Sequence, residues 1–389
     1  MSINAATFPY WRLSGFYLFY FAILGVVIPY FGPWLKFSGF TAQEIAQLTA
    51  AIMASRLISP NILGWIADHT NQALRLVQLF CILGALSFAL VFVEQSYHWL
   101  MFSFIAFSFF WNAVLPQFES ITLAHLGKAH HRYPQIRLWG SVGFILTVMG
   151  LGLLLEQQSP NIVPLITFFV LLGLMLNSLT VPDHALPHHH DNMPSFKTVL
   201  LRREVQALFV ICFLMQASHG AYYTFYSIYL QDHGYTGSSI GSLWALGVIA
   251  EIALFLGVSR YLKHYQLSSL LLISLLLAVL RWLLIGLLAD SLMILIIAQL
   301  LHAATFGLYH AVSIQYIHRY FPGRLQGRGQ ALHNSLSFGA GNAVGALISG
   351  YLWDYHTTLS FILCSLFALI AAWLCSAILS HEHFMMSTD

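Results

Sequence analysis

The stretch LKFSGFTAQEIAQL at Leu35–Leu48 recurs in outline as LQDHGYTGSSIGSL at Leu230–Leu243. Both copies carry, at matching places, Leu, Gly, an aromatic residue, Thr, Ile and Leu. The offset is 195 residues, about half of the 389-residue chain. Apolar runs flank each copy, but apolar composition does not account for a Gly-aromatic-Thr sequence between them. The match therefore indicates an internal repeat, and we predict that the chain consists of two similar halves.

Composition predicts that these halves lie in a membrane. Hydrophobic residues make up 58% of the chain and charged residues only 8%, whereas soluble domains carry about 25% charged residues. Such a chain cannot cover itself with a polar surface, so its exterior is expected to face lipid. The net charge of +2, with basic residues in short loops, gives no reason to expect a nucleic-acid partner. The first apolar run, at about 10–35, is too long for a cleavable signal peptide and is predicted to be a retained helix.

Polar, Gly and Pro clusters divide the chain into twelve predicted spans, each near the roughly 20 residues that cross a bilayer. We predict an all-α membrane protein of two six-helix bundles, 1–182 and 205–389, joined by a cytoplasmic linker at 183–204. The predicted helices are 10–35, 43–66, 74–93, 98–126, 136–155, 162–181, 206–230, 238–260, 266–288, 291–317, 326–352 and 357–380.

The basic residues predict the orientation. If both termini are cytoplasmic, only Lys36 falls in a loop on the opposite side, as the positive-inside rule expects. We therefore predict a multi-pass protein of the inner (cytoplasmic) membrane, functional as a monomer because each chain contains a complete pathway. The residues that then lie in or beside cytoplasmic segments are Arg12, Arg75, Lys128, Arg132, Arg137, Lys197, Arg202, Arg203, Arg260, Lys263, Arg319, Arg324 and Arg328.

Metal and cofactor sites are not predicted. The four cysteines lie in apolar runs without metal-ligand spacing and are expected to be inert buried thiols: Cys81, Cys212, Cys364 and Cys375. The linker is rich in histidine, for which metal binding is the alternative to a simple solvated segment, the interpretation that we favour. Its histidines are His184, His188, His189 and His190.

Charged side chains inside predicted helices are the first candidates for function. An ionised group at the bilayer centre costs at least about 2.5–3.5 kcal/mol. Because Arg56 and Glu251 are also 195 residues apart, we expect them at equivalent depths in opposite halves, facing each other across a central cavity. A purely structural salt bridge is the alternative, although an apolar contact would cost less. The remaining candidates of this kind are Glu119, Arg137 and Arg281.

Histidines and tyrosines form a second group of candidates. His219, Tyr222, Tyr223 and Tyr226 follow i, i+3, i+4, i+7 spacing, so they are expected on one helix face. Such a face suits a polar cavity with aromatic walls better than lipid tails, the alternative being an interfacial aromatic belt. Neutral histidine is cheaper to bury than arginine and titrates near physiological pH. Three further histidines lie in predicted helices: His302, His310 and His333.

The segment from Gly64 to Asp68, GWIAD, resembles the G-x-x-x-D loop motif of the major facilitator superfamily. That motif usually continues with basic residues, which His69-Thr70-Asn71 replace here. The resemblance implies that Gly64 and Asp68 take part in gating rather than in substrate choice.

Further motifs resemble, in the same order, the phenylpropionate permease group, whose members are related to the proton-coupled lactose permease. The resemblance covers essentially the whole chain and implies two six-helix bundles with a substrate site between them near the midplane. The motifs are Arg137-Leu138-Trp139-Gly140-Ser141, His219-Gly220-Ala221-Tyr222-Tyr223, LWALGVIAE at Leu243–Glu251, Arg281-Trp282 and Leu301-His302.

Residue roles follow from this resemblance. In lactose permease a Glu and an Arg eighteen residues apart on helices 4 and 5 bind sugar, and Glu119 and Arg137 have that spacing. Glu251, Arg281 and His302 resemble its helix 8 carboxylate, helix 9 Arg and helix 10 His, which serve substrate binding and proton coupling.

One position departs from the lactose permease pattern. A proton-handling Glu is expected three residues after His302, where this chain has Thr305. We therefore expect Glu251 to carry the proton, because an apolar surround favours a carboxyl group that can exchange one. Glu119 or a histidine such as His302 is the second choice.

Three arginines and two glutamates leave the predicted site with one surplus positive charge, among tyrosines and tryptophans. This favours a small aromatic or organic carboxylate, such as a 3-phenylpropionate-like acid, taken up with protons by alternating access. A proton-coupled oligosaccharide or nucleoside symporter is the alternative, because sugars also bind aromatic platforms and charged groups. The predicted substrate-binding residues are Arg56, Glu119, Arg137, His219, Tyr222, Tyr223, Arg281 and His302.

Two other classes of protein fit less well. A membrane enzyme would need a nucleophile or metal constellation, and the sequence contains no H-E-x-x-H and no paired aspartates. A receptor or scaffold would not need charged residues in both halves.

Overall fold

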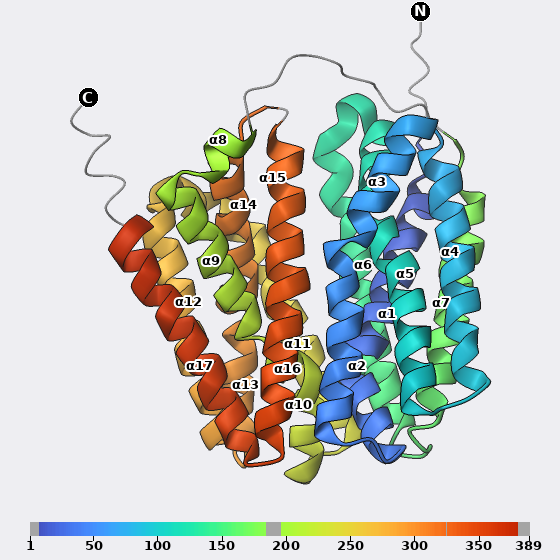
Figure 1. The fold of residues 1–389 in the computed structure, drawn as a ribbon, viewed down its shortest axis with the longest axis vertical. Coiled ribbons are helices and arrows are strands. Elements are labelled where there is room, and N and C mark those ends of the chain that lie inside the picture. Colours follow the sequence, from blue (N-terminus) through green and yellow to red (C-terminus); the bar gives the residue numbers. More distant parts are fainter. Residues whose placement is uncertain (1–7, 184–195, 324, 380–389) are drawn as a thin grey trace, which may run out of the picture.

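The computed structural model describes residues 8–183, 196–323 and 325–379, and its regular elements are all helices. Figure 1 shows two bundles side by side, with the short helix α8 (Phe196–Leu200), which lies in the predicted linker, at one end of the molecule. We call this the linker end and the opposite one the far end. The first bundle, the N-terminal half, contains α1 (Tyr10–Phe37), α2 (Ala42–Ala54), η1 (Ser55–Leu57), α3 (Ser59–Thr70), α4 (Ala73–Ala89), η2 (Leu90–Phe92), α5 (Tyr97–Leu126), η3 (Gly127–Arg132), α6 (Tyr133–Leu154) and α7 (Ile162–Thr180).

The second bundle, the C-terminal half, follows a short helix, α8 (Phe196–Leu200), that lies in the predicted linker and was not expected. The linker histidines lie outside the described residues. The helices of this half are α9 (Arg203–Ala217), α10 (Gly220–Asp232), α11 (Gly237–His264), α12 (Leu267–Leu287), α13 (Leu292–Leu300), η4 (Ala303–Leu308), α14 (Tyr309–Tyr320), α15 (Leu325–His333), η5 (Asn334–Gly341), α16 (Asn342–Trp353), α17 (Thr357–Leu374) and η6 (Cys375–Leu379).

Ten helical stretches of the described chain are long and apolar enough to cross a membrane. One of them, Tyr97–Leu154, contains two helices, α5 and α6, separated by the kinked segment η3. The run from α15 to α16 is not among the ten, because Gln, Asn, Ser and Gly residues lower its hydropathy. It is nevertheless helical throughout and packs against α2 and α9. The arrangement is consistent with the twelve predicted spans.

The repeated sequence has a local structural meaning. Gly39 and Gly234 adopt φ angles of 90° and 82°, which residues with a Cβ rarely tolerate, so glycine is needed where each chain segment leaves a helix. Two residues later, the hydroxyl groups of Thr41 and Thr236 accept hydrogen bonds from the backbone N–H groups of Glu44 and Ser239. Each threonine therefore caps the N-terminus of the next helix, α2 or α11. The repeat encodes the same turn and cap in both halves.

The two halves pack tightly against each other at the far end. A Cβ atom added at Gly152 would lie 2.4 Å from the carbonyl oxygen of Gly237, and one added at Gly241 would lie 2.3 Å from that of Val148. Helices α6 and α11 therefore touch backbone to backbone. Gly350 makes a similar approach to Ala46, between α16 and α2. Figure 1 shows the helices of the two halves converging toward this end.

Polar contacts reinforce the closed far end. Lys36, the one basic residue predicted for a loop on this side, forms an ion pair with Asp232 of the other half. The Glu156 carboxylate accepts a hydrogen bond of 3.0 Å from the backbone N–H of Ser238, in the first turn of α11. Toward mid-depth, the Ser335 hydroxyl lies 3.5 Å from the Leu57 carbonyl oxygen. The contacts between the halves thus extend from the far end to the middle of the molecule.

The Glu156 contact depends on an ionised carboxylate. Hydrogen bonds from the Ser238 hydroxyl, the Ser238 N–H and the Thr236 hydroxyl hold the pKa of Glu156 below its ordinary value. A lowered pKa contributes stability above the ordinary pKa, and this contribution is lost as the pH falls through the lowered one. At neutral pH the contact is therefore fully present.

Replacing Gly152 by Val should separate α6 from α11, because the added atoms would collide with the Gly237 carbonyl group. Thr224 is buried near α1 at this end, so a Cys placed there reports opening. We expect a membrane-impermeant maleimide to label this Cys at least about tenfold faster with Val at position 152 than with Gly. Gly150→Val is the matched control, because a Cβ there meets nothing within 4 Å. Equal labelling rates in the two variants would contradict the tight packing at Gly152.

Candidate functional site

Arg56 lies where the second span is interrupted by η1, a 3₁₀ turn. Its Nε donates a hydrogen bond of 3.1 Å to Oδ1 of Asn112 on α5. Asn112 in turn donates to the Ile52 carbonyl oxygen at 3.0 Å and to the Ser55 hydroxyl at 2.8 Å. Asn112 thus supplies a donor to a backbone carbonyl group at the interruption of the helix, and it orients Arg56. It was not among the sequence candidates, although a buried amide in an apolar helix is a usable signal.

Arg56 and Glu251 do not form an ion pair among the described residues. The repeat placed them at equivalent positions, but Arg56 belongs to a 3₁₀ turn and Glu251 to the continuous helix α11. Residues advance by about 120° in a 3₁₀ helix and about 100° in an α-helix, so equal depth does not give equal direction. Tyr223 lies between the halves, against a cluster formed by Ala50 and Met53 of α2 with Ala343 and Ala346 of α16.

Glu119 and Arg137 lie on α5 and near the start of α6, as the resemblance implied. Glu119 accepts a hydrogen bond of 3.2 Å from the Tyr133 hydroxyl, and it interacts with Arg137 electrostatically without a close ion pair. The Arg137 guanidinium has no hydrogen-bond partner among the described residues. Its central carbon lies 3.8 Å from the ring centroid of Phe21 and 5.8 Å from that of Tyr17. Arg137 therefore presents unused N–H donors above aromatic rings.

Arg281 is the opposite case, because it is fully buried and nearly all its donors are used. Its Nε donates to the Ala298 carbonyl oxygen at 2.9 Å. One terminal nitrogen reaches Nδ1 of His302 at 3.0 Å and the hydroxyl of Thr305 at 3.1 Å, and the other reaches Oε1 of Gln299 at 3.4 Å. Thr305, which replaces the expected Glu, thus accepts a hydrogen bond from Arg281.

Gln299 connects this arginine to the tyrosines of α10. Its Oε1 accepts from the Tyr222 hydroxyl at 2.9 Å, and its Nε2 donates to the Tyr226 hydroxyl at 2.6 Å. The Tyr222 ring lies 4.5 Å from that of Trp244 and 4.4 Å from the Arg281 guanidinium carbon. Neither Gln299 nor Trp244 was singled out in its own right from the sequence, although Gln299 is the only amide within the apolar run of α13.

Arg281 also decides how His302 is protonated. A guanidinium only donates hydrogen bonds, so Nδ1 of His302 must accept, and the proton of the neutral ring lies on Nε2. Nε2 lies 3.7 Å from the Glu251 carboxylate. The imidazole therefore directs an N–H toward the glutamate. Glu251 is partly exposed and also interacts electrostatically with Arg137 of the other half.

His219 lies at the break between α9 and α10, beside this network. Its ring centroid is 4.8 Å from Trp282 and 5.4 Å from Tyr223. The structure thus gathers seven sequence candidates around Arg281 or at the adjoining boundary between the halves: Arg56, His219, Tyr222, Tyr223, Glu251, Arg281 and His302. The two other residues predicted to bind substrate or protons, Glu119 and Arg137, lie in the N-terminal half, and Arg137 interacts electrostatically with Glu251.

Two helices beside the site are locally π-helical, at η4 and η5. Phe306 of η4 and Phe338 of η5 are 6.0 Å apart, measured between ring centroids. Short π-helical segments widen a helix and occur often at functional positions. They belong to the helices that carry His302 and His333.

Gly64 and Asp68 lie apart from the site, on α3 near the linker end. A Cβ atom added at Gly64 would lie 3.1 Å from Nε2 of Gln117, so this glycine lets α3 approach α5 closely. Asp68 is exposed. Their role in gating stays a prediction.

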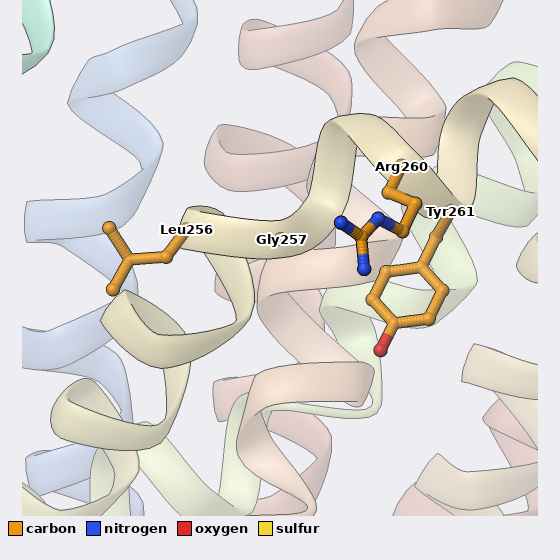
Figure 2. Close-up of a pocket in the computed structure, with 4 residues that line it drawn as sticks. All are labelled: Leu256, Gly257, Arg260 and Tyr261. Atoms are coloured by element: carbon orange, nitrogen blue, oxygen red, sulfur yellow. The ribbon is translucent and has the colours of Figure 1, made fainter.

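A pocket on α11 is separate from the site. Figure 2 shows Arg260 and Tyr261 side by side on this helix, with Leu256 and Gly257 completing the lining. With about 100° per residue, Leu256, Gly257 and Arg260 lie on the side of α11 away from Glu251. The described residues contain no group of three or more His, Cys, Asp or Glu side chains that could hold a metal ion. All four cysteines are buried, and they form no disulfide with one another.

Comparisons with known proteins agree with this architecture. A curated relative, the probable 3-phenylpropionic acid transporter of Escherichia coli (strain K12), is 30% identical over 360 residues, which cover 89% of this chain and 91% of the relative. The maltose permease of Geobacillus stearothermophilus is 25% identical over 361 residues, 88% of each chain. The crystal structure of the nucleoside transporter NupG superposes with a TM-score of 0.82 at 16% identity, covering 96% of this chain and 99% of that one.

A family model described as the MFS_1 like family matches residues 10–363. The match covers most of the chain, and the solved neighbour supports the same fold. The chain therefore belongs to the MFS_1 like family and is a multi-pass membrane transporter of the major facilitator type.

Proposed function

We propose that the protein takes up a small aromatic carboxylate together with protons, by alternating access in the inner membrane. The observation that carries the proposal is the unused guanidinium of Arg137, which interacts electrostatically with Glu251 across the two halves. The two halves would correspond to 1–182 and 205–389, joined at 183–204, with cytoplasmic termini and a functional monomer.

Arg137 is suited to hold the carboxylate. A guanidinium can bind a carboxylate through two parallel hydrogen bonds, and Arg137 has both edges available. Phe21 lies against its face at 3.8 Å and leaves those edges open. Arg56 is the other arginine of the N-terminal half predicted to bind substrate, and only its Nε donates a hydrogen bond, to Asn112. Arg281 is not available in the same way, because its donors are used within the C-terminal half.

Aromatic side chains of both halves would enclose the apolar part of the substrate. On one side, Tyr20 stacks on Trp111 with centroids 5.1 Å apart. On the other side, Tyr222 lies against Trp244 and 5.6 Å from Trp282. Offset rings of this kind bind a planar substrate ring well. The distribution of charge and aromatic surface thus matches an aromatic acid.

Coupling to protons follows from the shared position of Arg137. When its positive charge is free, Arg137 stabilises the ionised carboxylate of Glu251. A substrate carboxylate bound to Arg137 cancels that charge, so Glu251 then takes up a proton. His302 directs its Nε2–H to the same carboxylate, so it would favour the ionised form of Glu251 and help to set when the proton is taken up or released. Glu119, which interacts with Arg137 from the other side, is the second candidate.

Alternating access would proceed from the state described above, in which α6 and α11 touch at the far end. Gly64 and Asp68 at the linker end would help to close that side in the opposite state.

A nucleoside or an oligosaccharide is the second candidate substrate, because the NupG neighbour is named a nucleoside transporter and the Geobacillus relative a maltose permease. Counterflow in proteoliposomes with labelled 3-phenylpropionate, against unlabelled sugars and nucleosides, tests the two substrate classes directly. Sugar or nucleoside exchange without exchange of any carboxylate would overturn the anion proposal.

Arg137→Gln should abolish recognition of the carboxylate. Loss of a hydrogen-bonded charge partner costs about 2–5 kcal/mol, so we expect initial uptake to fall at least about 30-fold. Arg137→Lys should recover part of this, because lysine keeps the charge but not the paired hydrogen bonds. Uptake of labelled 3-phenylpropionate measures both, with Arg75→Gln as the exposed control. An unchanged rate in Arg137→Gln would assign the carboxylate to another group.

Glu251→Gln should separate binding from coupling. The amide cannot take up the proton, so substrate-dependent alkalinisation of the medium and accumulation against a gradient should both disappear. Substrate binding, followed by thermal shift of the purified protein, should persist, because Arg137 remains. Alkalinisation equal to that of the unchanged protein would exclude Glu251 as the proton carrier.

A further inference from the structure

His219 occupies a break in the helix that lines the C-terminal half of the site. Helix α9 ends at Ala217 and α10 begins at Gly220. A Cβ atom at Gly220 would lie 2.1 Å from the backbone of Gly345, so α10 presses against α16 at this point. His219 is fully buried there, and the local structure fixes its ring.

The hydrogen bond of one ring nitrogen determines the chemistry of the other. Nδ1 of His219 lies 2.8 Å from the carbonyl oxygen of Met215, one turn earlier. A carbonyl oxygen only accepts, so Nδ1 carries the proton. In the neutral ring, Nε2 is therefore a bare lone pair. This nitrogen is buried and has no hydrogen-bond partner among the described residues.

Three donors near His219, on Trp282, Tyr222 and Arg281, are engaged elsewhere, and the Tyr223 hydroxyl does not donate to its Nε2. The Trp282 indole N–H donates to the Ser218 hydroxyl at 3.1 Å. The Tyr222 hydroxyl donates to Gln299, and Arg281 donates to four acceptors of its own half. A buried acceptor without a donor costs free energy, and proteins rarely leave one so placed. The site thus lacks one hydrogen-bond donor, at a position walled by aromatic rings.

The position of this lone pair is significant for the substrate. The His219 ring lies against Tyr223 and Trp282, and its third aromatic neighbour is Phe306 at 6.3 Å. Tyr223 reaches the boundary between the halves, where it packs against the cluster that α2 and α16 form there. An aromatic ring bound at this boundary would bring one edge toward His219.

We propose that Nε2 of His219 accepts a hydrogen bond from a hydroxyl group on the substrate ring, so that the preferred substrate is a hydroxylated aromatic carboxylate. This inference rests on the proposed function and names its substrate class more closely. An unsubstituted ring would leave the buried lone pair unpaired, whereas a ring hydroxyl supplies the missing donor. The carboxylate and the hydroxyl would then be recognised by different halves, through Arg137 and His219.

The test compares counterflow of 3-phenylpropionate with that of its 2-, 3- and 4-hydroxyphenyl analogues in proteoliposomes. We expect one hydroxylated isomer to be preferred about tenfold, the usual size of one buried neutral hydrogen bond. His219→Asn keeps a short amide near Met215 but removes the acceptor at the Nε2 position, so the preference should fall to within about twofold. His219→Gln places its amide oxygen farther out and should restore part of it.

For each variant we compare the exchange rate of the preferred hydroxylated acid with that of 3-phenylpropionate. Because both rates come from the same protein preparation, differences in expression or folding cancel in their ratio. His333→Asn is the matched control, because Nε2 of His333 is also buried and unpartnered but lies beside Phe338, away from Tyr223 and Trp282. It should leave the ratio unchanged. Equal rates for all four acids, or a preference that survives His219→Asn, would overturn this inference alone. A preference lost in Tyr223→Phe but kept in His219→Asn would assign the contact to Tyr223. If no aromatic acid is exchanged, the proposed function and this inference both fail.

Discussion

The buried guanidinium of Arg281 is the constraint on which the site depends. A cation without water must have its donors satisfied, and its hydrogen bonds to Ala298, His302, Thr305 and Gln299 do this. Each bond has a consequence. The bond to His302 turns its remaining N–H toward Glu251, and Gln299, held by the same guanidinium, positions the tyrosines of α10. The arginine organises the C-terminal half before any substrate arrives.

The N-terminal half has the complementary character. Arg137 has the same charge as Arg281, but it lies over aromatic rings with its donors unused. Arg56 is tied to Asn112 by one nitrogen only. One half therefore holds a satisfied and rigid network, and the other offers free cations. This asymmetry is what distinguishes residues that shape the site from residues that are free to hold an anion, although both halves derive from the same repeated pattern.

Sequence reasoning located the helices to within about four residues at each end, because apolar runs and their interruptions follow directly from the thickness of the bilayer. It also predicted most of the charged and aromatic residues that the structure brings together. It missed Asn112, Gln299 and Trp244, whose importance comes from the partner that each one meets. The expected pairing of Arg56 with Glu251 did not allow for η1, because a 3₁₀ turn changes the direction of a side chain but not its depth.

Composition and local pattern were enough to predict the membrane class, the repeat with its Gly turn and Thr cap, and the set of polar residues that lipid would not tolerate. These properties depend on composition and on neighbours along the chain. Packing between helices establishes that Arg281 uses four of its five N–H donors while those of Arg137 are unused, that Thr305 accepts a hydrogen bond from Arg281, and that Nε2 of His219 is unpaired. Whether a hydrogen bond forms between two helices depends on ring orientation and on differences of a few tenths of an ångström in the donor–acceptor distance. No pattern along the sequence specifies these quantities.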